Sequence, residues 1–296
     1  MNKRKIVVSS NSGFCFGVKR ALDIAQAALK KKGKVYSLGP IIHNPQVVRD
    51  FSEKGLKIVK DINRAVPEKA AFLIPSHGIN PEALLNKKGA CIDTTCPLVS
   101  RVQKIVKDLR RRGYLTVIVG DRKHPEVKAL AGIAGRNSVV LKDRKKAGAL
   151  KLESKKIAVV SQTTASFSSF KEILSEIAKK DFTELVSFNT VCRNAIDRQK
   201  EAGRIAGRVG AMLVIGGRQS ANTSRLADTC RSVNKNTYHI ESGKNLKRKF
   251  FKGKKSIGIA TGASTPPDAI KEVVKKINEA TTYGAKRRKS CGRIDP

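Results

Sequence analysis

The sequence is poor in acidic and in aromatic residues. Only 24 aspartates and glutamates accompany 61 lysines and arginines among 296 residues, which gives a formal net charge of +37. Tryptophan is absent and only four tyrosines occur. Basic surfaces bind phosphate backbones, but RNA-binding modules also stack bases on aromatic rings interleaved with the basic residues. Because that interleaving is missing, we do not expect specific nucleic-acid recognition, and a solvated basic surface explains the charge equally well.

Long apolar runs and a cysteine pairing pattern are also missing. No stretch of about 18 apolar residues could cross a membrane, and the first residues lack the apolar core of a secretory signal. The six cysteines show no close pairing scheme, which favours a reducing cytoplasm in which thiols are ligands or lie buried. With 40% apolar residues, the chain is long enough to fold into two or three small domains.

Short apolar segments alternate with amphipathic ones, and a small polar turn follows each apolar segment. The predicted strands are 5–8, 35–38, 71–75, 115–119, 157–160, 186–188, 212–215 and 257–260. This alternation predicts an α/β fold with parallel sheets, in which ligands bind beyond the carboxyl ends of the strands. We expect three units related by a pseudo-threefold axis, followed by a mobile basic tail: residues 16–96, 97–190, 191–282 together with 1–15, and the tail 283–296.

Three cysteines share one local context, because Cys15, Cys96 and Cys192 each lie between a short strand and a helix. They are too far apart for a local zinc finger, and the gaps between them, 96 − 15 = 81 and 192 − 96 = 96 residues, are each about the size of a small α/β unit, so we predict that they meet at one metal site. A closed Cys3His zinc site is one option. An iron–sulfur cluster with three protein ligands and one open iron is the other. The remaining cysteines are expected to be packed or partly buried (Cys91, Cys230) or exposed in the tail (Cys291).

Three of the four histidines, His43, His77 and His124, lie at predicted strand-to-helix turns. One such histidine alone would be read as a structural turn residue, but three at equivalent strand ends favour a binding site. Hydroxyl and amide side chains occupy further turns of this kind: Thr163, Ser220, Asn222 and Ser264. Such donors near helix N-termini suit a diphosphate. Glu126, close to His124, is either a solvated turn carboxylate or a proton carrier. No turn matches a nucleotide-binding fingerprint.

Taken in order, these motifs resemble one protein family over about residues 5–282. The resemblance rests on Gly13-Phe14-Cys15-Phe16-Gly17-Val18, His43-Asn44, Ser76-His77-Gly78, Asp93-Thr94-Thr95-Cys96-Pro97, His124-Pro125-Glu126-Val127, Asn189-Thr190-Val191-Cys192, Ser220-Ala221-Asn222 and Gly262-Ala263-Ser264. The family is that of the 4-hydroxy-3-methylbut-2-enyl diphosphate reductases, or LytB proteins, of the non-mevalonate isoprenoid pathway. The resemblance implies a cloverleaf of three α/β units around a 4Fe-4S cluster held by Cys15, Cys96 and Cys192, with one iron open to substrate.

The resemblance also implies roles for the turn residues. His43, His77, His124, Ser220, Asn222 and Ser264 would bind the diphosphate, and Glu126, helped by Thr163 beside the substrate, would supply protons. The implied reaction is a reductive dehydroxylation that gives isopentenyl and dimethylallyl diphosphate, with electrons from a ferredoxin or flavodoxin. We expect a monomer without a membrane or nucleic-acid partner.

The chain departs from the family in three respects. Asn194 and Ala195 replace a common Ala-Thr pair after Cys192, the net charge is unusually positive, and the basic tail has no counterpart in the family's active-site motifs. The alternative hypothesis is a basic nucleic-acid-binding protein with a structural Cys3His zinc site.

Overall fold

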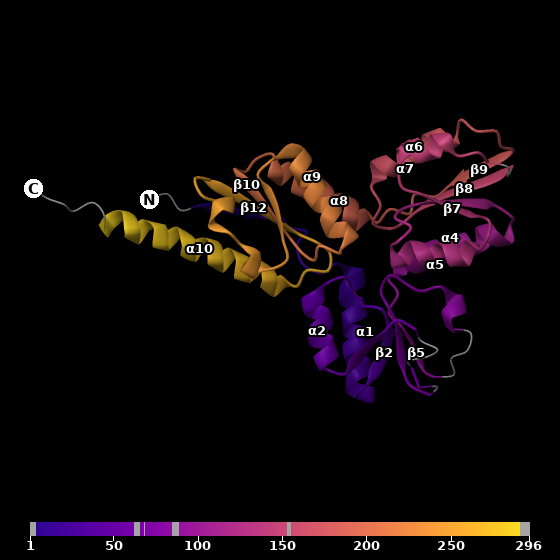
Figure 1. The fold of residues 1–296 in the computed structure, drawn as a ribbon, viewed down its shortest axis with the longest axis horizontal. Coiled ribbons are helices and arrows are strands. Elements are labelled where there is room, and N and C mark those ends of the chain that lie inside the picture. Colours follow the sequence, from indigo (N-terminus) through magenta and orange to yellow (C-terminus); the bar gives the residue numbers. More distant parts are fainter. Residues whose placement is uncertain (1–3, 62–65, 68, 85–88, 153–154, 291–296) are drawn as a thin grey trace, which may run out of the picture. The chain divides into compact units, whose positions relative to one another are not determined.

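The fold consists of parallel sheets covered by helices (Figure 1). A computed structural model describes residues 4–61, 66–67, 69–84, 89–152 and 155–290, with backbone only for 280–290. Within these residues the strands form three four-stranded sheets, and every strand pairing is parallel. The predicted α/β class with parallel sheets is therefore confirmed.

The three sheets have the same number of strands and equivalent strand orders. Sheet A has the order β1 (Lys5–Val8), β12 (Ser256–Thr261), β10 (Ala211–Ile215), β11 (Thr237–Ile240). Sheet B has the order β5 (Cys91–Asp93), β4 (Phe72–Ile74), β2 (Val35–Leu38), β3 (Leu56–Val59). Sheet C has the order β9 (Glu184–Ser187), β8 (Lys156–Ser161), β6 (Leu115–Val119), β7 (Ser138–Leu141).

Helices fill most of the connections between strands. The longer ones are α1 (Phe16–Lys32), α2 (Pro45–Glu53), α4 (Pro97–Arg111), α5 (Pro125–Ala134), α6 (Arg144–Ala149), α7 (Phe167–Ile177), α8 (Arg193–Ala206), α9 (Ala221–Val233) and α10 (Pro267–Ser290). The described residues also include the short 3-10 helices η1 (Pro81–Leu84), η2 (Gly243–Asn245) and η3 (Arg248–Phe250).

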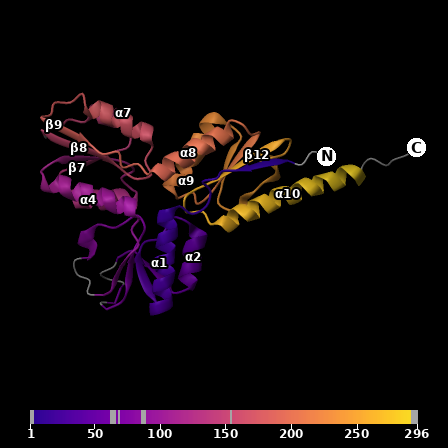
Figure 2. The same cartoon turned by 180° about the vertical axis from the view of Figure 1, so that it is seen from behind.

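Sheet C lies between two helical layers, with α4 and α5 on one face and α6 and α7 on the other (Figures 1 and 2). Its central strand β6 is apolar along almost its whole length because both of its faces are buried. Ile118 packs toward α4 and α5, while Val117 packs toward α7. Successive residues of a strand point to opposite faces, so one apolar strand supplies both cores.

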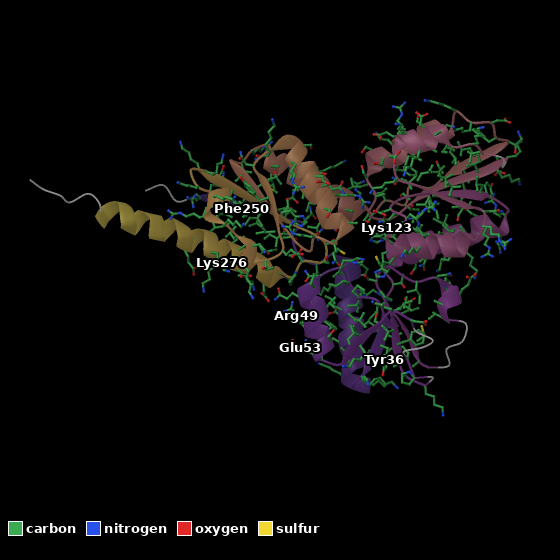
Figure 3. The ribbon with its side chains drawn as sticks, viewed as in Figure 1. Tyr36, Arg49, Glu53, Lys123, Phe250 and Lys276 are labelled. Carbon is green, nitrogen blue, oxygen red and sulfur yellow. The ribbon has the colours of Figure 1, made fainter. Side chains whose placement is uncertain are left out.

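Sheet A is covered in the same manner. Met212 and Val214 pack with α8 and α9, while Leu213 and Ile215 pack with α10 and the segment around η3. Phe250, labelled in Figure 3, stacks on Tyr238 with the ring centroids 4.2 Å apart. Next to strands β2 and β3 of sheet B in the chain, helices α1 and α2 lie side by side in both views (Figures 1 and 2).

The described chain forms two compact units, Met1–Cys15 with Asp197–Pro296, and Phe16–Ile196. Sheet A belongs to the first unit, and sheets B and C belong to the second. α10 runs through Ser290 and so includes residues 283–290, which the sequence analysis assigned to the tail. Residues 291–296, with Cys291, lie outside the described residues. No helix in the described ranges is both long enough and apolar enough to cross a membrane.

One cysteine prediction was wrong. Cys91 is exposed at the start of the edge strand β5, whereas packing or partial burial was expected. An edge strand lacks a neighbour on one side, and the side chains of β5 alternate between exposed and half-buried. Cys230, in contrast, is fully buried under sheet A, as predicted.

Candidate active site

The three cysteines occupy equivalent positions in the three sheets. Each follows an edge strand (β1, β5 or β9) and directly precedes a helix (α1, α4 or α8). Each main-chain N–H donates to a carbonyl in the turn after the neighbouring central strand: Cys15 to Ala263 (3.0 Å), Cys96 to Ser76 (2.9 Å) and Cys192 to Thr163 (2.7 Å). One backbone arrangement therefore recurs three times at the carboxyl ends of the strands.

The predicted binding residues occupy these same turns. Ser264, His77 and Thr163 lie in the turns after β12, β4 and β8, and the first two directly follow the carbonyls that accept from the cysteines. The next central strand of each sheet carries the others: Ser220 and Asn222 after β10, His43 after β2, and His124 and Glu126 after β6. Each sheet thus presents one cysteine turn beside two turns with polar side chains.

The surroundings of Cys96 fit a metal-bound thiolate. Cys96 is half-buried at the N-cap position of α4, where its side chain makes no capping hydrogen bond. A Cβ atom built on Gly17, near the start of α1, would lie 2.5 Å from Cys96 Sγ. The sulfur therefore fits against a position that only glycine leaves open. The positive ends of helix dipoles favour an anionic sulfur, and thiolates are the usual ligands of iron–sulfur clusters.

Cys15 lies in one compact unit, while Cys96 and Cys192 lie in the other. In the part of the chain that the structure describes, no three or more His, Cys, Asp or Glu side chains form a ready metal-binding group. The meeting of the three cysteines therefore remains a prediction, which their equivalent positions support.

The histidines of sheets B and C form a cluster. The ring of His43 is stacked on that of His77 with 5.2 Å between centroids, and His124 lies 5.4 Å from His43 and 6.4 Å from His77. Burial, followed by the charges of His43 and His124, lowers the pKa of His77 from 6.5 to about 3. Burial also lowers the pKa of His43. His77 Nδ1 is buried without a hydrogen-bond partner among the described residues. Since buried polar groups normally have a partner, a polar ligand could supply one at this cluster.

His124 and Glu126 are held by the first turn of α5. His124 Nδ1 accepts the Glu126 N–H at 3.2 Å, so the imidazole proton lies on Nε2 and can be donated to a ligand. Glu126 is only 2% exposed. Its two carboxylate oxygens accept the Thr163 N–H at 2.6 Å and the Thr163 hydroxyl at 2.9 Å. The solvated alternative for Glu126 is therefore wrong, because the carboxylate is buried against one hydroxyl partner.

Sheet A contributes uncharged polar groups. Ser220 is the N-cap residue of α9, where its hydroxyl accepts the Thr223 N–H at 3.4 Å. Asn222 is 7% exposed, and its Nδ2 is buried with no hydrogen-bond partner among the described residues. Ser264 is buried in the turn that also binds the Cys15 peptide group. An unpartnered amide at a helix N-terminus suits an anionic ligand.

Two polar residues that support the cysteine turns were not predicted from the sequence. Glu201 on α8 accepts hydrogen bonds from Ser9, Ser10 and Asn11, which precede Cys15. Arg20 on α1 donates to the carbonyl of Thr95, directly before Cys96, at 3.1 Å. Both look like ordinary helix-surface charges in the sequence, and only the packing of distant segments distinguishes them.

These features define an α/β protein of three parallel sheets, each with a cysteine turn and polar binding turns at one end. The model of the LytB protein family matches residues 6–278. The chain therefore belongs to the LytB family, which confirms the resemblance found in its sequence.

The sequences of two relatives align with nearly the whole chain. The 4-hydroxy-3-methylbut-2-enyl diphosphate reductase of Geobacter metallireducens is 40% identical over 93% of this chain and 97% of that protein. The enzyme of the same name from Caldanaerobacter subterraneus is 42% identical over 92% and 96%. None of these relatives is named as a nucleic-acid-binding protein, so the alternative hypothesis gains no support.

Two solved structures are similar in fold. One is an (E)-4-hydroxy-3-methyl-but-2-enyl diphosphate reductase, named as the terminal enzyme of the non-mevalonate pathway. It is 38% identical with a TM-score of 0.67, and the match covers 94% of this chain and 100% of that chain. The reductase from Plasmodium falciparum is 25% identical with a TM-score of 0.85 and covers 93% and 88%.

Proposed function

We propose that this protein reduces 4-hydroxy-3-methylbut-2-enyl diphosphate to isopentenyl and dimethylallyl diphosphate. The observation that carries the proposal is the threefold repeat of a cysteine whose peptide N–H is bound by a turn with predicted substrate-binding residues. The repeat pairs one metal ligand with substrate contacts in every sheet. Family membership and the names of the relatives support the same reaction.

Cys15, Cys96 and Cys192 would hold an iron–sulfur cluster, the cofactor class that family membership supports. With three protein ligands, the finer proposal is a 4Fe-4S cluster with one iron open to the substrate oxygen. When bound, such a cluster supplies single electrons and a Lewis-acidic iron. Three α/β units, residues 16–96, 97–190 and 191–282 with 1–15, would surround this centre, and residues after 282 would form a basic extension. Each of the three sheets would provide one ligand, from the turn after its edge strand β1, β5 or β9.

The diphosphate would be bound by groups that donate hydrogen bonds without carrying a fixed charge. His43, His77 and His124 would contribute imidazole N–H groups, and the unpartnered Asn222 amide would contribute another donor. Hydroxyl groups of Ser220 and Ser264 complete the proposed set. Burial keeps His77 neutral without ligand, and a bound dianion would raise its pKa.

Glu126 and Thr163 would deliver protons. The overall reaction consumes two electrons and two protons, and it releases the hydroxyl group as water. A proton held on Glu126 can pass to Thr163 Oγ1, 2.9 Å away, while Thr163 gives its own hydroxyl proton to the substrate. The second bond, from the Thr163 N–H to Glu126, fixes the carboxylate for this transfer, and burial leaves Glu126 only 2% exposed to water.

The electron donor would be a small acidic carrier such as a ferredoxin or flavodoxin, since opposite charge speeds encounter with a chain of net charge +37. The six cysteines show no close pairing scheme, which fits a reducing cytoplasm, and we propose that the protein acts there as a monomer. Ala195 stands where many family members have threonine, so this chain would lack one hydroxyl beside Cys192.

The proposal is tested by anaerobic purification with iron and sulfide analysis and a turnover assay on the allylic diphosphate. Cys15→Ser, Cys96→Ser and Cys192→Ser should each lose the stable cluster and turnover. Cys91→Ser is the matched control, because Cys91 is an exposed free cysteine in the strand directly before Cys96. Full activity of Cys96→Ser, or equal loss in Cys91→Ser, would refute the assignment.

A further inference from the structure

We infer that Glu201 is a positioning residue that fixes the loop carrying Cys15 and thereby keeps this cysteine in place for metal binding. The inference about the loop stands on contacts within one compact unit. Its consequence for the metal rests on the proposed function.

The Glu201 carboxylate holds three consecutive residues. Its Oε1 accepts the Ser10 N–H at 2.8 Å and the Ser10 hydroxyl at 2.9 Å. Its Oε2 accepts the Ser9 hydroxyl at 2.7 Å, the Asn11 N–H at 3.2 Å and the Asn11 side-chain amide at 2.8 Å. Two carboxylate oxygens offer about four lone-pair sites, so five donors use their full accepting capacity. No neutral side chain of this size can accept as many.

The carboxylate is charged over the whole working pH range. Burial alone would raise the pKa of Glu201, but the hydrogen bonds from Ser9, Ser10 and Asn11 outweigh it and lower the pKa to about 2. Charge-assisted hydrogen bonds are roughly twice as strong as neutral ones. The loop is therefore held firmly at physiological pH.

The rest of the loop is anchored to sheet A. The Ser9 N–H donates to the carbonyl of Ile259 at 2.8 Å, and the Gly13 N–H donates to Thr261 Oγ1 at 2.8 Å. The Cys15 N–H then binds the carbonyl of Ala263. Glu201 fixes the residues between the Ser9 and Gly13 anchors. Its loss would free this middle part of the loop, while Ser9 and Gly13 would remain bound to sheet A.

The same relation recurs at a second cysteine. Glu201 lies on α8, the helix that follows Cys192, and it binds the residues before Cys15. Arg20 lies on α1, the helix that follows Cys15, and it binds the residue before Cys96. In both cases the helix after one cysteine supports the approach to another. This repetition points to a positioning role, because a charge placed only for solubility would not repeat this relation.

The loop is tested first by hydrogen exchange on the full-length protein as purified. Glu201→Gln and Glu201→Ala should lose amide protection in the peptide that contains Ser10 and Asn11, whose N–H groups the carboxylate accepts. Glu272→Gln is the matched control in the same unit. Glu272 also accepts a backbone N–H, from Gly243 at 3.3 Å, and pairs with Lys276, labelled in Figure 3, at 3.0 Å. Unchanged protection of this peptide in folded Glu201→Gln would overturn the inference.

The metal is tested by the rate at which a chelator removes iron and by the EPR spectrum and reduction potential. Loss of a residue that orients a ligand should speed iron release by about tenfold and alter the spectrum, while Glu272→Gln should match wild type. If hydrogen exchange in the Glu201 variants increases while iron release and the EPR spectrum stay unchanged, Glu201 has no role in metal binding. A wild-type protein without any cluster would refute the proposed function instead, and the exchange result would still decide the role of Glu201 in the loop.

Discussion

Replacement of Gly17 by alanine should separate metal binding from folding. Gly17 is near the start of α1, and an added Cβ would lie 2.5 Å from Cys96 Sγ and 3.1 Å from Cys96 Cβ. Non-bonded heavy atoms of this kind rest at about 3.5–4.0 Å, so the sulfur would have to retreat by about 1 Å. Metal–ligand distances tolerate only about 0.2 Å. The displaced thiolate should therefore be lost as a ligand.

The same substitution should leave the protein folded. Overpacking of this size costs about 1–3 kcal/mol, and alanine recovers about 0.5–1 kcal/mol of that through its higher helix propensity. A typical domain is stable by about 5–15 kcal/mol, so the folded state remains dominant. We expect Gly17→Ala to show a near-normal circular dichroism spectrum and a thermal midpoint only several degrees lower, together with substoichiometric iron and sulfide after reconstitution.

The control is Gly148→Ala in α6, because the nearest atom to an added Cβ there is Glu176 Oε2 at 3.7 Å. This variant should bind iron as wild type does and be slightly more stable. The assay is iron and sulfide content per chain, measured beside the unfolding curve of each variant. Normal iron content in Gly17→Ala would show that Cys96 Sγ is not a ligand in the geometry described here.

Three further outcomes are expected. Glu126→Gln should retain the cluster but lower kcat by about 100-fold or more, and Thr163→Ser should keep far more activity than Thr163→Ala because serine preserves the hydroxyl. The pKa of His77 falls from 6.5 to about 3 on folding, so the unfolded chain binds the extra proton between these values. The free energy of unfolding should therefore decrease as pH falls from 6.5 toward 3, and His77→Asn should flatten this slope in urea titrations against pH. Finally, stopped-flow reduction by an acidic carrier should slow as ionic strength rises, and a rate independent of salt would exclude electrostatic steering.

The sequence predicted most of the fold because strand-forming and turn-forming signals coincide. The buried strands β6, β8, β10 and β12 are apolar runs that end in polar turns, and periodicity identifies such segments well. The edge strands β3 and β7 were not predicted. They are short, and β3 carries exposed Lys57 and Ile58, so no apolar alternation marks it. Pairing with a neighbouring strand, which is a tertiary interaction, makes these segments strands.

The candidate site could be predicted in its residue types but not in its contacts. His124 and Glu126 are adjacent in sequence, yet the partner that decides the environment of Glu126 is Thr163, which is distant in the chain. Glu201 gave no signal for the same reason, since its five donors lie near the other end of the sequence. The local sequence pattern predicts where a turn lies. Hydrogen bonds between residues distant in the sequence determine the protonation and mobility of its side chains.

The position of the cysteines at sheet edges has a mechanical consequence. Each cysteine follows the outermost strand of its sheet, while the polar binding turns follow the two inner strands. An outer strand is tethered along one side only, so it can shift slightly without breaking the pairing of the inner strands. As the proposed metal ligands, the cysteine thiolates would therefore adapt to small changes in bond length when the metal centre gains or loses an electron. The turns after the inner strands would move less because those strands are paired on both sides, so a bound diphosphate would keep its position.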